Sequence, residues 1–251
     1  MEGRVAIVTG AARGIGAAIA RTLAAHGATL LLADLDRPAV EALAVQLPHA
    51  HALQADVADA GDAERLAHTA ETLFGRIDIL NNNVGVAGMG GPIELSEADW
   101  DGLIAANLNG VFLNCKHVLP IMLGQGKGAI ANLSSVAAIR WTGYPHGACY
   151  AAKAGVNQLT VGLALQHAAQ GIRANDPLPG FIDTPLIHKQ ISGQYASDAA
   201  MIAARNAAST TGCVGTPWDV ANAAVFFASD AAGYLNGVCL PVDGGLSCRA
   251  A

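Results

Sequence analysis

The sequence has little charge and few aromatic residues. Only 14% of its 251 residues are charged and 5% are aromatic, whereas 52% are hydrophobic. A chain of this composition can bury a large core, which excludes a disordered protein. The net charge is −6 and no run of lysines and arginines occurs anywhere. This argues against a nucleic-acid partner, because phosphate groups are held by clustered cations.

Cysteine motifs and long apolar runs are also missing. The five cysteines (115, 149, 213, 239 and 248) follow neither a zinc-ligand spacing nor the pattern of a small secreted domain, so we expect reduced thiols and no metal. No apolar run reaches the ~18 residues that a membrane span needs. The first residues, MEGRVAIVTG, enter a strand pattern without the layout of a signal peptide. The sequence therefore predicts a soluble cytoplasmic protein.

Short apolar runs alternate with helix-patterned stretches along the whole chain. Strands that are apolar throughout are buried on both faces, which is typical of a parallel sheet covered by helices on both sides. Without a linker or repeat to divide the chain, we predict the α/β class, with one doubly wound Rossmann-type domain over residues 1–251. The less regular segment 184–212 is predicted to form helical pieces on a lid over a site. Seven strands are expected, within 4–10, 28–34, 51–57, 77–83, 128–135, 171–180 and 236–242.

The segment TGAARGIG (9–16) follows the first expected strand and opens a helix. Glycines there let the backbone approach a pyrophosphate, and the start of the helix offers free N–H groups. The same pattern would also suit a tight strand-to-helix turn that binds nothing. The glycines alone leave both alternatives open.

Asp34 strengthens the case for a dinucleotide. It ends the second expected strand eighteen residues after Gly16, close to the ~20 at which an acid accepts a hydrogen bond from a ribose hydroxyl. Asp36, just before Pro38, is better placed to cap the next helix, which leaves Asp34 for the ribose. The charge of Asp34 would repel a 2′-phosphate, so we expect NAD rather than NADP. Arg13 favours the opposite choice weakly, since its guanidinium could meet the extra phosphate.

Several further motifs, in order, resemble the short-chain dehydrogenase/reductase family in its compact single-domain branch. The match runs from Val5 to about Gly245. It comprises TGxxxGxG at 9–16, DV at 56–57, NNNVG at 81–85, NLNGVF at 107–112, NLSS at 132–135, PGFIDT at 179–184 and VDGG at 242–245. The resemblance implies hydride exchange between a nicotinamide and an alcohol or ketone carbon, with a phenol passing the proton. It also implies a homotetramer.

The resemblance assigns individual roles as well. Ser135 would hydrogen-bond the substrate oxygen, and Asn107 would hold a water in the proton path. Lys153 would bind the nicotinamide ribose and lower the pKa of the phenol. Thr184 would lie near the nicotinamide carboxamide. The implied cofactor contacts are Gly10, Arg13, Gly14, Ile15, Gly16, Asp34, Asp56, Val57, Asn83, Gly85, Lys153, Pro179, Gly180 and Thr184.

These side chains also have simpler interpretations. Asn107 shares a helix face with apolar residues and should be buried, where it could merely satisfy a distorted helix turn. Ser135 ends the fifth strand, at the edge where parallel sheets bind ligands, and we interpret Ser134 as the turn serine. Lys153 could be a surface lysine. In the loop after Ser135, the aromatic residues Trp141, Tyr144 and His146 either pack the loop or form a substrate wall.

The stretch CYAAK (149–153) departs from the family's Tyr-x-x-x-Lys. Counting back four residues from Lys153 places the family's tyrosine on Cys149, and Tyr150 would point about 100° away around a regular helix. A tightened first turn could still bring Tyr150 into the site. Both therefore remain candidates for the proton donor, with Cys149 favoured as the residue that holds the slot.

A second departure is RANDPLPG (173–180), where Asp176 and Pro177 replace the family's small or apolar residues. Because proline cannot donate to a sheet ladder, we expect the end of the sixth strand to be disturbed.

Together these features predict an NAD-dependent secondary-alcohol dehydrogenase or ketone reductase. The alternative is a nucleotide-binding protein of the same fold with impaired or no turnover, because Cys149 holds the tyrosine slot. An epimerase or dehydratase on the same scaffold is a third alternative. The aromatic and apolar residues of the loop and lid favour an apolar, cyclic substrate.

Overall fold

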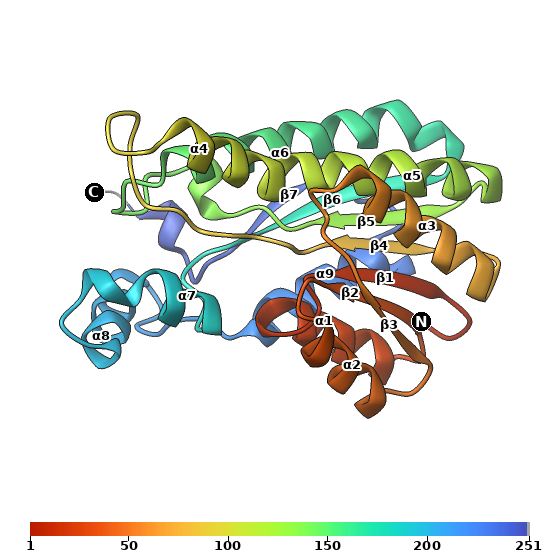
Figure 1. The fold of residues 1–251 in the computed structure, drawn as a ribbon, viewed down its shortest axis with the longest axis horizontal. Coiled ribbons are helices and arrows are strands. Elements are labelled where there is room, and N and C mark those ends of the chain that lie inside the picture. The colour runs from red at the N-terminus through yellow and green to blue at the C-terminus, as the bar shows by residue number, and fades with distance from the viewer. Residues whose placement is uncertain (250–251) are drawn as a thin grey trace.

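The computed structural model describes residues 1–249 and contains one sheet of seven strands (Figure 1). The strand order is β3-β2-β1-β4-β5-β6-β7, and neighbouring strands pair in parallel. This confirms the doubly wound, Rossmann-type α/β fold. The strands are β1 (Val5–Thr9), β2 (Thr29–Asp34), β3 (Ala50–Gln54), β4 (Ile79–Asn82), β5 (Gly128–Asn132), β6 (Ile172–Pro179) and β7 (Cys239–Val242).

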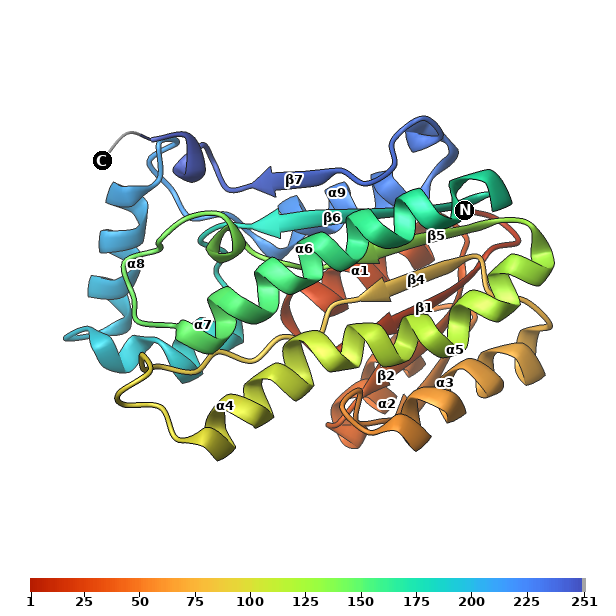
Figure 2. The same cartoon turned by 90° about the horizontal axis from the view of Figure 1, so that it is seen from above.

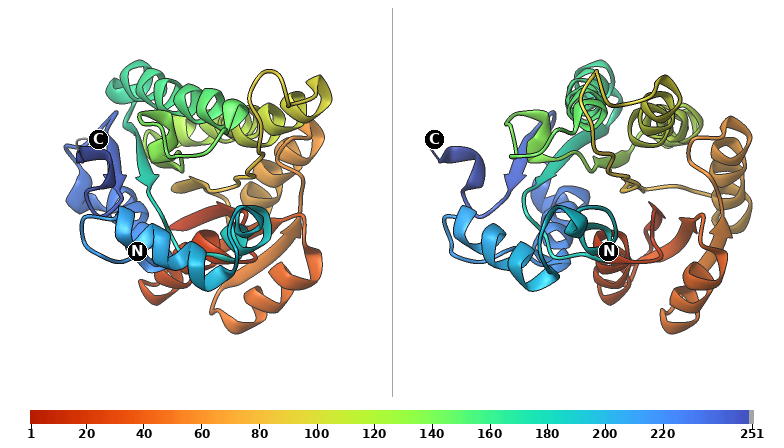
Figure 3. Two further views of the ribbon diagram at one scale, coloured as in Figure 1. Left: turned by 90° about the vertical axis from the view of Figure 1, so that its left-hand side faces the viewer. Right: turned by 60° about the vertical axis from the view of Figure 1, so that its left-hand side comes forward.

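Helices cover both faces of the sheet (Figures 1 and 3). One face carries α1 (Gly14–Ala25), α2 (Arg37–Gln46) and α9 (Pro217–Ala228). The other carries α3 (Ala60–Phe74), α4 (Glu97–Ile104), α5 (Gly110–Gln125) and α6 (Gly147–His167). Two further helices, α7 (Pro185–Gln190) and α8 (Asp198–Ala208), project past the carboxyl ends of the strands (Figure 2). Within residues 1–249, no helix is both long enough and apolar enough to cross a membrane.

The central strands β1 and β2 are largely apolar because a core lies on either side of each. Alternate residues of a strand point to opposite faces, and in β1 the fully buried Ile7 and Val8 accordingly belong to two different clusters. Val8 packs with the α1, α2 and α9 layer, whereas Ile7 packs with α3, α5 and α6. Each such side chain contributes about 1.5–3 kcal/mol by leaving water.

Ser96 caps the start of the helical segment that leads into the site. Its hydroxyl accepts from the Asp99 N–H (3.1 Å) and donates to the Asp99 carboxylate (2.6 Å). Helix α4 then passes through a π-helical turn, Ala105–Asn109, into α5. A π turn inserts an extra residue into the helix and often marks a functional position. Here that turn contains Asn107.

Pro177 interrupts the pairing of strand six on one side only. Strand β6 continues to Pro179 and pairs with β7 through Asp176 and Pro177. On the other side the β5–β6 pairs end at Asn175, although the Pro177 carbonyl still accepts from the Ser134 N–H. The N–H that proline lacks would point to this same side, so the disturbance that we expected is confined to the ladder with β5.

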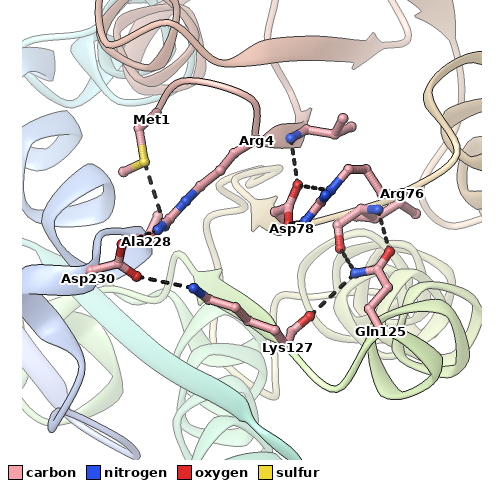
Figure 4. Close-up of polar contacts among 10 residues, drawn as sticks. Met1, Arg4, Arg76, Asp78, Gln125, Lys127, Ala228 and Asp230 are labelled. Carbon is pink, nitrogen blue, oxygen red and sulfur yellow. Dashed lines mark hydrogen bonds and ion pairs between the residues drawn. The ribbon is translucent and has the colours of Figure 1, made fainter.

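A polar cluster closes the amino-terminal edge of the sheet, away from the carboxyl ends of the strands (Figure 4). Buried Asp78 accepts from the Val5 N–H (2.8 Å) and from the Arg76 guanidinium (2.9 and 2.6 Å). Arg4 pairs with Asp230 and also donates to the Ala228 carbonyl at the end of α9. These contacts join the start of β1 to β4 and α9.

Candidate active site

A cavity of about 560 Å³ opens at the carboxyl ends of the strands. Strand order reverses between β1 and β4, and open parallel sheets bind ligands at such a switch point. Gly10 follows β1, Asn83 follows β4 and Ser135 follows β5, so the topology gathers residues that lie far apart in the sequence. Lys153, on α6, lines the same cavity.

The glycine loop (residues 9–16) forms the floor of the cavity at one of its ends. Gly10 (φ +62°) and Gly14 (φ +57°) have left-handed backbones that glycine adopts without strain. Gly16 does not line the cavity; instead it packs so closely on the Gly10 carbonyl that a Cβ would not fit. No side chain caps the start of α1, and its first residues, Gly14 and Ile15, line the cavity. Uncapped N–H groups at a helix start, facing a cavity, suit a phosphate.

Asp34 lies where the sequence predicts an acid for the ribose. It lines the cavity, and its carboxylate also accepts from the backbone N–H groups of Ala12 (2.9 Å) and Asp36 (3.0 Å), which orients it. Asp36 caps α2 by accepting from Ala39 (3.2 Å), as we expected. Arg13 forms an ion pair with Asp36. The guanidinium that could favour a 2′-phosphate therefore already has a carboxylate partner.

The other expected cofactor residues lie on the surrounding walls. Asn83 ties β4 to the glycine loop, since its amide donates to the Gly10 carbonyl (3.0 Å) and its backbone N–H donates to the Thr9 hydroxyl (3.2 Å). Six further residues expected to contact the cofactor also line the cavity: Asp56, Val57, Gly85, Pro179, Gly180 and Thr184.

Lys153 is buried rather than a surface lysine, with only 8% of its surface exposed. Its ammonium donates to the Leu133 carbonyl at the end of β5 (2.7 Å). Burial lowers the pKa of Lys153, and the charges of Asp176 and Cys149 oppose this shift. The ammonium is thus held at the cavity wall by the backbone.

Asp176 is a buried carboxyl group behind Lys153. It is fully buried, and its Oδ1 accepts from the Ser134 N–H (2.9 Å). Burial raises the pKa of Asp176 to about 8, against the opposing effects of Lys153 and the Ser134 bond. The sequence marked Asp176 only as a departure from the family, because nothing in a single sequence says that it lies beside a lysine.

The two serines after β5 differ from our interpretation. We expected Ser134 to be the turn serine, but Ser135 caps the 3₁₀ turn that follows by accepting from the Ala137 N–H (3.1 Å). Ser134 is buried and donates to the Lys153 carbonyl (2.9 Å). Ser135 nevertheless lines the cavity, and a hydroxyl that accepts from the backbone still has its proton to donate.

Asn107 is buried, as its helix face predicts, and lines the cavity. Its amide donates to the carbonyls of Leu103 (2.9 Å) and Val86 (3.0 Å), and its oxygen accepts from the Val86 N–H (3.1 Å). The bond to Leu103 satisfies the widened helix turn, while the bonds to Val86 fix the chain after β4. The side chain therefore has a structural task in addition to its place in the cavity.

Neither candidate for the proton donor lines the cavity. Tyr150 donates to the Tyr144 carbonyl (2.8 Å), and its oxygen lies 3.1 and 3.0 Å from the Thr142 nitrogen and hydroxyl. Its ring stacks on Trp141, so the phenol is bound to the loop. The Cys149 thiol points to the Val86 carbonyl (3.6 Å), next to Asn107. Cys149 thus faces the site residues, but its side chain ends short of the cavity.

Two of the three aromatic residues considered for a substrate wall, all in the loop before α6, line the cavity. Tyr144 and His146 line the cavity, with the His146 ring held by the Gly88 carbonyl (2.9 Å). Trp141 is exposed and does not line it. Segment 184–212 contains α7 and α8. Ile187 of α7, Ile191 directly after it and Arg205 of α8 line the cavity. Sequence reasoning missed Arg205, because one arginine in a polar helix pattern carries no signal.

Comparison with known proteins agrees with this arrangement. A family model described as Enoyl-(Acyl carrier protein) reductase matches residues 10–247. The D-threitol dehydrogenase of Mycolicibacterium smegmatis is 42% identical over 99% of this chain and 95% of its own length. The cis-4-hydroxycyclohexanecarboxylate dehydrogenase of Sinomonas cyclohexanicum is 41% identical over 96% of each chain.

Among solved structures, a short-chain dehydrogenase/reductase from Burkholderia xenovorans superposes with a TM-score of 0.95. It is 38% identical and covers 100% of this chain and 98% of its own. These similarities extend over nearly the whole length of each protein, which means that they include the sheet, the glycine loop and the lid helices. The chain belongs to the short-chain dehydrogenase/reductase family.

Proposed function

We propose that the protein is an NAD-dependent oxidoreductase that interconverts secondary alcohols and ketones. The observation that carries this proposal is a single cavity lined by the glycine loop at one end and by Ser135, Lys153 and Asn107 at the other. The relatives named above are dehydrogenases of hydroxylated compounds. A phosphate site joined to a hydroxyl donor and a cation suits a dinucleotide beside an alcohol.

Two local features support NAD over NADP. Asp34 lines the cavity with a carboxylate already oriented by two backbone bonds. Its charge favours the two hydroxyls of a ribose and repels a 2′-phosphate. Arg13, the nearby cation that could offset this repulsion, is paired with Asp36. The uncapped start of α1 would hold the pyrophosphate, and Lys153 and Thr184 the nicotinamide end.

The protein's own groups would bind and polarise the substrate. When bound, the cofactor supplies or accepts the hydride. Ser135 donates its proton to the substrate oxygen, which places that oxygen near Lys153 at the same wall. The buried ammonium, in a medium of low dielectric, favours negative charge on that oxygen and on any acid beside it. Asn107 holds the Val86 segment against this wall.

The step that this chain supports poorly is proton transfer. The Tyr150 phenol is bound to the loop, and the Cys149 thiol ends at the Val86 carbonyl. General acid–base help is typically worth about 10²–10⁴-fold in rate. We therefore propose a weakened dehydrogenase, and the alternative is a nucleotide-binding protein of the same fold with no turnover.

A panel of secondary alcohols with NAD distinguishes these possibilities. We expect slow, NAD-dependent formation of NADH, followed by its absorbance, with at least one alcohol, and slower or no reaction with NADP. Binding of NAD, followed by calorimetry, together with the absence of turnover by every alcohol would support the non-catalytic alternative.

We also propose a homotetramer, in line with the family resemblance. Large apolar side chains on the outer faces of neighbouring helices support it, with Phe112 of α5 52% exposed and Leu165 of α6 77% exposed. Light scattering coupled to gel filtration would give the mass in solution, and a monomeric mass would contradict this proposal.

A further inference from the structure

Arg205 is the feature of the cavity that the proposed function leaves unexplained. It lies on α8 and lines the cavity, and only 3% of its surface is exposed. Its Nε has no hydrogen-bond partner within residues 1–249, and no carboxylate in that part of the chain forms an ion pair with it. An unpaired buried charge is costly, by several kcal/mol per ion.

The other arginines show how unusual this is. Within residues 1–249, every other arginine donates to a carboxylate, amide or carbonyl oxygen. Most of them are exposed enough to use water as well. The one arginine that the fold buries is thus the one that donates to none of these oxygens. The fold therefore keeps a cationic donor at the cavity whose Nε has no partner and whose guanidinium meets the Tyr195 phenol rather than a carboxylate within residues 1–249.

Aromatic rings surround the guanidinium. Its Cζ lies 4.7 Å from the centre of the Phe181 ring and 5.8 Å from the centre of the Tyr144 ring. Contact between a cation and the face of an aromatic ring is favourable, but it provides no oxygen that could accept from the N–H groups of the guanidinium. Around it, the buried side chains of Ile187, Ile191 and Met201 pack with Tyr144 and Tyr195, which keeps the local dielectric low.

The other cation of the lid is placed differently. Lys189 also lines the cavity, but it is exposed, so water already solvates its ammonium. A solvated lysine gains little from an anionic ligand, whereas a desolvated, pre-oriented guanidinium gains much and can bind both oxygens of a carboxylate.

We propose that Arg205 binds a carboxylate group of the substrate, so that the enzyme acts on hydroxy acids whose alcohol lies away from the acid group. This rests on the proposed function, since the alcohol is to meet Ser135 in the same cavity. The aromatic faces of Tyr144 and Phe181 and the aliphatic lid suit an apolar spacer between the two groups. Neutral alcohols of the same shape would leave the guanidinium unpaired and would bind weakly.

The test uses two probes that differ only in charge, cis-4-hydroxycyclohexanecarboxylate and its neutral primary amide. With the wild-type protein and NAD, we expect kcat/KM for the acid to exceed that for the amide at least ~30-fold, as a charge-assisted bond to a buried group implies. In Arg205→Met the KM for the acid should rise by a similar factor while the amide changes less than ~3-fold. Arg249→Met, an exposed charge removed from the same side of the molecule, should behave like the wild type.

Three results would overturn the proposal. The first is an equal kcat/KM of the wild type for the acid and the amide. The second is an equal loss of kcat/KM for both probes in Arg205→Met. The third is that Lys189→Met loses the preference for the acid while Arg205→Met keeps it. The first comparison needs only the wild type, so a variant that fails to fold leaves the test intact.

Calorimetry keeps this inference separate from the proposed function. The acid should bind the wild type in the presence of NAD and the amide should not, even if neither is oxidised. If nothing in the alcohol panel is turned over but the acid binds in an Arg205-dependent way, the dehydrogenase proposal fails and the carboxylate site stands. If neutral alcohols are turned over but the acid does not bind, the dehydrogenase proposal stands and the carboxylate site fails.

Discussion

Replacing Cys149 by tyrosine should increase the activity of this protein. Cys149 lies one helical turn before Lys153, and its thiol already points along the Val86 chain toward Asn107. A tyrosine there would carry its hydroxyl past the Val86 carbonyl toward the cavity wall where Ser135 and Lys153 lie. The buried ammonium of Lys153 would lower the pKa of that phenol, because it favours the ionised form.

The expected gain is at least ~10-fold in kcat/KM, which corresponds to about 1.4 kcal/mol of barrier. We take a value below the ~10²–10⁴-fold of a well-placed acid, since the larger side chain must displace part of the Val86 segment. Cys149→Phe is the matched control. It adds the same ring without a hydroxyl and should give no increase. The activities of the wild type, Cys149→Tyr and Cys149→Phe are measured from NADH absorbance with the best alcohol of the panel.

Tyr150→Phe completes the experiment. The Tyr150 hydroxyl contacts Thr142 and Tyr144 in the loop, so its loss should lower stability by about 1–3 kcal/mol, or a few degrees in Tm for a chain of this size. Turnover should change little. The reasoning fails if Tyr150→Phe abolishes turnover of a protein that stays folded while Cys149→Tyr brings no increase.

Three further predictions concern the buried and cofactor-facing charges. Asp34→Ala should narrow the preference for NAD over NADP in calorimetric titrations, because it removes the charge that repels a 2′-phosphate; a wild type that binds NADP more tightly would contradict it. Lys153→Met should weaken NAD binding and abolish turnover with an unchanged far-ultraviolet spectrum, since it keeps the buried chain but removes the ammonium; full activity in this variant would show that the lysine has only a packing role. Asp176→Asn should change how stability depends on pH. The pKa of Asp176 is raised to about 8 from an unfolded value near 4, so between these pH values the folded wild type holds one more proton than the unfolded chain. The stability that this proton contributes is complete below pH ~4. It is lost as the pH rises to about 8, by up to ~1.4 kcal/mol per pH unit. Urea unfolding from pH 5 to 8 should show a flatter profile for Asp176→Asn, and parallel profiles would refute the shift.

The sequence alone was enough for the fold and for bringing the glycine loop and Asp34 to one end of the cavity. Apolar runs with Ile7 and Val8 side by side require burial on both faces, and a parallel sheet meets this requirement. Gly16 and Asp34 are close in the sequence, so helix α1, the turn after it and strand β2 follow from local hydrophobic patterns and turn residues. Asp36 as the cap of α2 and Ser96 as the cap of α4 were predictable for the same reason.

The tertiary structure decided what each polar side chain contacts. Pro177 leaves the pairing of β6 with β7 intact because its missing donor faces β5 instead, and no property of the residue itself indicates this. Asp176 becomes a buried acid beside Lys153 only because β6 and α6 pack together. Tyr150 is bound to its own loop, and Arg205 lies over the Phe181 ring at the cavity, where no carboxylate within residues 1–249 forms an ion pair with it. A residue's type and spacing determine the chemistry it can offer, but burial and neighbours set its charge, its orientation and its free donors. Those neighbours are brought together by long-range packing that a single sequence does not reveal.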